Sequence, residues 1–191
     1  YMSALDYSTA LYEVSVGLIK QPENRNSLIQ AFVRLPSPVQ INYLKSFDSY
    51  INNIVGVERR LTDDTLEILN NAVDMFREIE MNNGTDTTAG IFSLYLYKLA
   101  VYNHRGELVQ MKEVFEKCKD MIGSLMYRGE YLDYIFIFYN RYAVYLIDNF
   151  AVEEAYELID KVREAFEGLE LAVASFPYQE ESKTFSYIQL G

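Results

Sequence analysis

One stretch of the sequence places a positive charge among aromatic rings at helical spacing. Around Arg141, this spacing predicts an aromatic face beside an apolar stripe of the same helix. Aromatic rings can cover the apolar side chains of a peptide, and a guanidinium can bind a carboxylate through two parallel hydrogen bonds. Asn140, its neighbour, could pair with a backbone amide. The candidate ligand-binding residues are Tyr97, Tyr134, Phe138, Asn140, Arg141 and Tyr145.

The same residues have a second, structural interpretation. An apolar stripe at helical spacing usually belongs to the core. The rings could therefore pack between neighbouring helices, with Arg141 paired to Asp148 or to another acid. Both interpretations stay open at this stage.

Few other residues have the chemistry of a catalytic or metal site. His104 is the single histidine, and it stands near an expected helix end, where a positive charge interacts well with the helix dipole. Cys118 is the single cysteine and lies on an apolar stripe, so we expect a small core residue and no disulfide. No glycine-rich phosphate loop, nucleophile elbow or metal-ligand spacing occurs. We therefore expect no enzyme, no cofactor and no metal ion.

Composition narrows the class of protein further. The 191 residues include 28 acids and 17 bases, which gives a net charge of −11 and disfavours binding to a phosphate backbone. The most apolar window, 131–150, is interrupted by charged and amide side chains, so it falls short of a membrane span. The N-terminus lacks a basic segment followed by an apolar one. We expect a soluble, cytoplasmic protein that binds neither nucleic acid nor membrane.

The elements that must position these residues follow an internal repeat. Two apolar stripes share the steps 3, 4, 3, 4 and 3, and each member of the second lies 44 residues after its partner. The first stripe is Leu108, Met111, Phe115, Cys118, Ile122 and Leu125, and the second is Val152, Ala155, Ile159, Val162, Phe166 and Leu169. Four positions upstream, from Ile91 to Tyr102, match Ile135 to Leu146 at the same offset. We infer two copies of one helix–turn–helix unit.

Weaker signals extend the pattern over the whole chain. We predict a single all-α domain over residues 1–191, with helix pairs at about 2–35, 38–82, 88–127 and 130–174. Residues 178–191 would form a capping or truncated helix. Helix pairs that cannot bury their apolar stripes alone must stack on their neighbours, so the predicted fold is an α-solenoid of about four antiparallel pairs.

The second copy resembles a tetratricopeptide (TPR) unit. The resemblance rests on the segment from Tyr139 to Leu146, with its small Ala143, and on Ala155 twelve residues later. The period of 44 exceeds that of the family, and HEAT-like pairs remain an alternative. The long, Tyr-rich repeats are also loosely similar to the sensor domains of bacterial peptide-pheromone receptors.

The TPR resemblance implies that the first helix of each pair lines a concave groove. We therefore expect a non-enzymatic module that binds a peptide or protein segment, as the sensor or scaffold part of a bacterial regulator. The alternative is a structural domain for homo-oligomerisation, such as a homodimer, or for docking within a larger protein.

Overall fold

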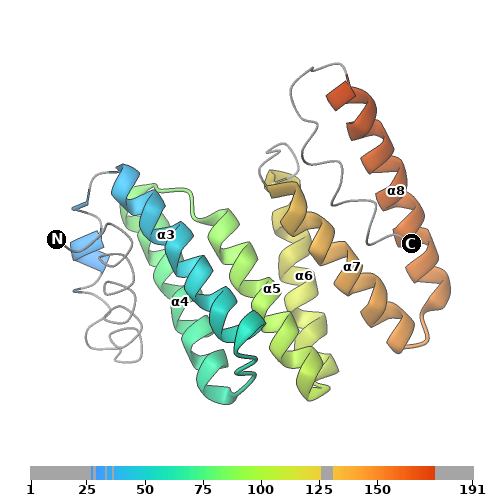
Figure 1. The fold of residues 1–191 in the computed structure, drawn as a ribbon, viewed down its shortest axis with the longest axis horizontal. Coiled ribbons are helices and arrows are strands. Elements are labelled where there is room, and N and C mark those ends of the chain that lie inside the picture. Colours follow the sequence, from blue (N-terminus) through green and yellow to red (C-terminus); the bar gives the residue numbers. More distant parts are fainter. Residues whose placement is uncertain (1–26, 28, 33, 36, 126–130, 175–191) are drawn as a thin grey trace. The chain divides into compact units, whose positions relative to one another are not determined.

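In a computed structural model, the protein is helical throughout the part that is described (Figure 1). The structure describes residues 27, 29–32, 34–35, 37–125 and 131–174. No strand occurs among them, which confirms the all-α prediction for this part of the chain. The expected helix at 178–191 lies outside the described residues, as does most of the expected pair at 2–35.

The described residues divide into two compact units. Unit 1 ends at Phe138 and unit 2 begins at Tyr139. The boundary falls inside helix α7, Leu132–Asp148. The expectation of one continuous domain stays a prediction.

Unit 1 contains four whole helices, α3 (Ser37–Asn52), α4 (Asp63–Asn83), α5 (Thr88–Arg105) and α6 (Leu108–Leu125). The first half of α7 follows them in the same unit. Helix α5 contacts α3, α4 and α6, so it occupies the centre of this unit (Figure 1). A π-helical turn, Asn53–Val57, continues α3. Unit 2 contains the second half of α7 and α8, Val152–Ala174.

Local chemistry explains where several helices begin and end. The Thr62 side chain accepts a hydrogen bond from the backbone N–H of Thr65 and so caps the start of α4. Helix α4 ends at Gly84 and α5 ends at Gly106, and both glycines adopt the left-handed conformation that commonly terminates helices.

Phenylalanine rings build the core of unit 1. Phe47 of α3 and Phe76 of α4 are almost fully buried, with ring centroids 5.7 Å apart. Phe138 of α7 lies 5.9 Å from Phe92 of α5 and 5.8 Å from Phe115 of α6, centroid to centroid. Helices α3, α4, α5, α6 and α7 thus each contribute a phenylalanine ring to this core.

The two predicted stripes are buried to different degrees. Five of the six positions on α6 are buried, and Leu108 is exposed because it is the first residue of the helix. On α8, Ala155 is buried, whereas Val152 and Ile159 are exposed. The described part of unit 2 gives α8 a single partner helix, which cannot cover its whole stripe.

The turns between helices are alike in the two units. One joins α5 to α6 and the other joins α7 to α8, and each contains one residue in the left-handed region, Gly106 (φ 69°) and Phe150 (φ 61°). Three backbone hydrogen bonds recur 44 residues apart. In the first turn they run from Gly106 N–H to the Asn103 carbonyl (3.1 Å), from Glu107 N–H to the Tyr102 carbonyl (3.0 Å) and from Met111 N–H to the Glu107 carbonyl (3.0 Å). In the second turn they run from Phe150 N–H to the Ile147 carbonyl (3.0 Å), from Ala151 N–H to the Leu146 carbonyl (2.9 Å) and from Ala155 N–H to the Ala151 carbonyl (3.0 Å).

Candidate functional site

A polar cluster joins three helices of unit 1. Asp48 of α3 is half-buried, and its Oδ1 accepts a hydrogen bond from the buried hydroxyl of Ser93 on α5. Its Oδ2 accepts a hydrogen bond of 3.3 Å from the hydroxyl of Tyr134, in the first turn of α7. Tyr97 lies one helical turn after Ser93, on the same side of α5. We call these four residues, Asp48, Ser93, Tyr97 and Tyr134, the Asp48 cluster.

The two tyrosines of the cluster stay protonated over the physiological range. Burial raises the pKa of Tyr97 above its ordinary value, and the negative charge of Asp48 raises it further. Burial and the Asp48 carboxylate also raise the pKa of Tyr134, to about 12. Both phenols are therefore neutral hydrogen-bond donors beside one carboxylate.

The Asp48 carboxylate has no basic partner among the residues that the structure describes. Its contacts with the side chains that the structure describes are with hydroxyl groups, and the ion pairs between those side chains join other acids. A half-buried carboxylate that accepts hydroxyl hydrogen bonds but meets no cation keeps an unbalanced negative charge.

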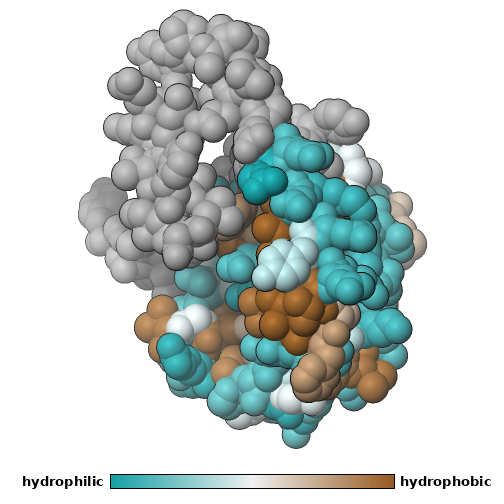
Figure 2. Space-filling model, turned by 90° about the vertical axis from the view of Figure 1, so that its right-hand side faces the viewer, coloured by the Kyte–Doolittle hydropathy of each residue, from teal (hydrophilic) through white to brown (hydrophobic). Residues whose placement is uncertain are grey.

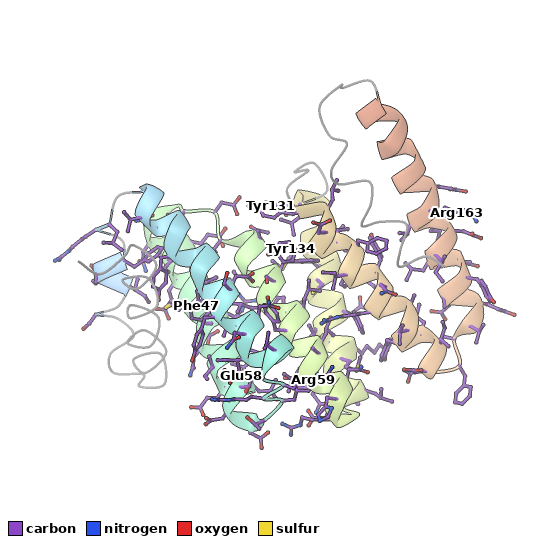
Figure 3. All side chains as sticks on the ribbon, viewed as in Figure 1. Phe47, Glu58, Arg59, Tyr131, Tyr134 and Arg163 are labelled. Atoms are coloured by element: carbon purple, nitrogen blue, oxygen red, sulfur yellow. The ribbon has the colours of Figure 1, made fainter. Side chains whose placement is uncertain are left out.

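An additional ring extends the cluster toward the start of α7. Tyr131, just before this helix, is half-buried, and its ring centroid lies 6.4 Å from that of Tyr134 (Figure 3). The two rings are tilted by 41°. Tyr97 and Tyr134 thus place aromatic side chains beside the carboxylate, and Tyr131 extends this aromatic group.

The structure brings together two of the six residues predicted from the sequence. Tyr97 and Tyr134 meet at Asp48, as described above. Phe138 is fully buried and packs against Phe92 and Phe115, so it follows the structural interpretation and is not part of the candidate site.

The other three predicted residues belong to unit 2. Asn140 is exposed, whereas Arg141 and Tyr145 are half-buried. Tyr145 stacks on Tyr142, with ring centroids 6.2 Å apart and an interplanar angle of 13°. Their assignment to a ligand-binding site stays a prediction.

Sequence reasoning missed Asp48 and Ser93. A signal for each was present, because Ser93 precedes the selected Tyr97 by one helical turn, and Asp48 is the single acid of α3 in a chain rich in acids. A single acid on a helix whose other polar residues are a lysine, hydroxyls and amides is a reason to look for a polar contact.

A second polar group lies on the opposite side of α5. Lys98 is 8% exposed, and its Nζ lies 5.6 Å from the ring centroid of Tyr95 and 5.8 Å from that of Tyr102. Burial lowers the pKa of Lys98. Arg77 of α4 donates a hydrogen bond of 2.7 Å to the Tyr95 hydroxyl. Cation–π contacts of this kind favour a buried ammonium, so this group has a structural role in the packing of α4 against α5.

Cys118 lies in the core of unit 1, as expected from its stripe. Its side chain is fully buried, and burial raises the pKa of the thiol to about 12, an effect that the charge of Lys98 reduces in part. This thiol is therefore a packing residue.

The described part of the chain holds no group of three or more His, Cys, Asp or Glu side chains placed to bind a metal ion. None of its helices combines the length and the apolar character that a bilayer crossing requires. Comparisons with protein-family models, with curated proteins and with solved structures give no match. The arrangement at Asp48 is thus the best-defined candidate site, and its carboxylate and neutral phenols suit a ligand with positive charge or N–H donors.

Proposed function

We propose that this chain is a non-enzymatic, TPR-like helical-repeat module that binds a peptide or protein segment, as the sensor or scaffold part of a regulatory protein. The observation that supports this most directly is that the Asp48 cluster draws its side chains from α3, α5 and α7. These are the first helices of the three expected pairs that the structure describes, and such helices line the groove in TPR proteins.

The two similar turns support the repeat itself. The same three backbone hydrogen bonds, 44 residues apart, join the two helices in each of two successive pairs. Side chains on successive first helices would then recur along one face, which suits the extended backbone of a bound segment.

The test is a selection of random peptides on the immobilised protein, followed by affinity measurements on the recovered peptides. Tyr134→Ala should weaken binding by about tenfold or more, because a central aromatic contact is often worth over 1 kcal/mol. Tyr156→Ala is the matched control, since Tyr156 of α8 is 67% exposed and lies outside the cluster. Thermal melts of both variants show whether the fold is retained.

Two results would contradict the proposal. One is that no peptide is recovered from the selection. The other is that recovered peptides bind the folded Tyr134 variant as tightly as they bind the unaltered chain.

Self-association is a second candidate function, and exposed side chains of unit 2 favour it. Phe150 is 92% exposed, and Val144 and Ile147 of α7 are nearly half exposed. Hydrophobic side chains are exposed among hydrophilic ones on the face that Figure 2 shows. Exposed apolar patches of this kind commonly mark association surfaces. Sedimentation velocity over a range of concentrations tests this function, and Ile147→Ser should then reduce the dimer fraction.

A further inference from the structure

We propose that the Asp48 cluster binds a positively charged side chain, arginine or lysine, of the bound segment. This inference rests on the proposed function and names the chemistry of its ligand. It differs from the sequence-based hypothesis, in which Arg141 binds a carboxylate of the ligand.

The first argument is charge. Asp48 is half-buried and its described contacts are hydroxyl groups, so none of the side chains that the structure describes forms an ion pair with it. A cationic group of a ligand would balance this charge and would form hydrogen bonds of the stronger, charge-assisted kind. The net charge of −11 would also attract a basic segment over longer distances.

The second argument is the shape and chemistry of the surroundings. Tyr97 and Tyr134 stand near the carboxylate, and the ring of Tyr131 contacts that of Tyr134. Aromatic faces attract ammonium and guanidinium groups. Because the phenols of Tyr97 and Tyr134 keep their protons, they add donors without adding charge. Asp48 therefore remains the acceptor for the ligand cation.

The third argument is the distribution of basic groups around α5. Residues 93 and 97 face one side of this helix, whereas Lys98 and its two tyrosine rings face the other. The bases Arg77 and Lys117 and the acids Asp74 and Glu113 all act on Lys98, so this second side carries charges of both signs. On the side with the Asp48 cluster, the charge that acts on Tyr97 and Tyr134 is the negative charge of Asp48, and no basic group is among the causes of their raised pKa values.

The experiment is a double-mutant cycle between the protein and a selected peptide. Random peptides are selected on the unaltered chain, and one that contains arginine is resynthesised with citrulline, which keeps the shape but removes the charge. The protein partner is Asp48→Asn, and Asp133→Asn is the matched control because Asp133 is an exposed acid next to Tyr134.

We expect arginine and lysine to be enriched at one position of the selected peptides. Citrulline and Asp48→Asn should each weaken binding by about tenfold or more, and the two changes together should cost little more than either alone. Asp133→Asn should leave the affinity within about twofold. If Asp48→Asn fails to fold, Tyr134→Leu takes its place in the cycle, since it removes a ring and keeps the carboxylate.

The outcomes separate the two proposals. If peptides bind without enrichment of basic residues, or if the effects of citrulline and Asp48→Asn add fully, the cationic-ligand inference is overturned while peptide binding stands. If no peptide binds at all, the proposed function fails and this inference fails with it.

Discussion

At the scale of single residues, two helical glycines have opposite surroundings. A Cβ at Gly90 of α5 would lie 2.7 Å from Cε2 of Phe76, whereas a Cβ at Gly123 of α6 would meet no atom within 4 Å. Phe76 is fully buried in the core, so its ring has little room to move. Gly90 therefore permits the close approach of α4 and α5, and Gly123 has no comparable role.

Alanine at these two positions should change stability in opposite directions. Gly90→Ala should lower the free energy of unfolding by about 1–2 kcal/mol, because overpacking outweighs the gain in helix propensity. Gly123→Ala should raise it by about 0.5–1 kcal/mol. Urea denaturation of both variants measures the difference, and equal shifts in the same direction would contradict it.

Cys118 should be unreactive in the folded protein. Its buried thiol, with a pKa raised to about 12, holds very little thiolate at neutral pH. We expect a chromogenic disulfide reagent to modify it at a rate set by opening of the fold, and to react fast in denaturant. Cys118→Ser gives the background, and rapid labelling of the folded chain would refute the assignment.

The limits of sequence reasoning are clearest at this scale. Tyr97 and Tyr134 could be selected because helical spacing places them beside an apolar stripe. Asp48, where these tyrosines meet, could not be selected from the sequence, because its partners Ser93 and Tyr134 lie 45 and 86 residues away along the chain. Spacing defines the face of one helix, but the neighbour that this face meets depends on how the helices pack.

At the scale of elements, caps and turns were the most predictable features. Thr62 caps the start of α4, Gly84 ends α4 and Gly106 ends α5. Each does so through a residue type that favours that position. The π-helical turn after α3 was not predicted. Its hydrogen bonds join residues five positions apart, such as the 2.8 Å bond from Glu58 N–H to the Asn53 carbonyl. No particular side-chain pattern in the sequence indicates such bonds.

The two similar turns should respond in opposite ways to substitution. Phe150 has a positive φ that a side chain disfavours and is 92% exposed, so Phe150→Gly should stabilise the protein by about 0.5–1 kcal/mol. Gly106→Ala should destabilise it by about 1 kcal/mol. Thermal unfolding compares the two, and a loss of stability in Phe150→Gly would indicate that this ring makes contacts that matter.

At the scale of the whole molecule, several tyrosines of the described chain have raised pKa values. The chain has 17 tyrosines and no tryptophan. Burial raises the pKa of Tyr95, Tyr97, Tyr102 and Tyr134. Nearby acids raise it further in all four, although Arg77 opposes the shift at Tyr95. The folded state therefore keeps protons that the unfolded chain releases above about pH 10.

This difference predicts a loss of stability at alkaline pH. The contribution of these tyrosines is fully present below about pH 10 and is lost as pH rises toward the higher pKa of the folded state. Urea melts at about pH 9, 10 and 11 should show a falling free energy of unfolding, accompanied by tyrosinate absorbance. Tyr134→Phe should make the fall less steep, and an unchanged slope would argue against a raised pKa at this residue.

The likeness of the two turns has a genetic consequence. A stretch of chain that starts at one turn and ends at the next begins and finishes in the same backbone conformation, held by the same hydrogen bonds. Tandem duplication or deletion with both breakpoints in these turns would change the number of helix pairs by one and would leave each junction intact. The gene could thus lengthen or shorten its product in whole structural steps.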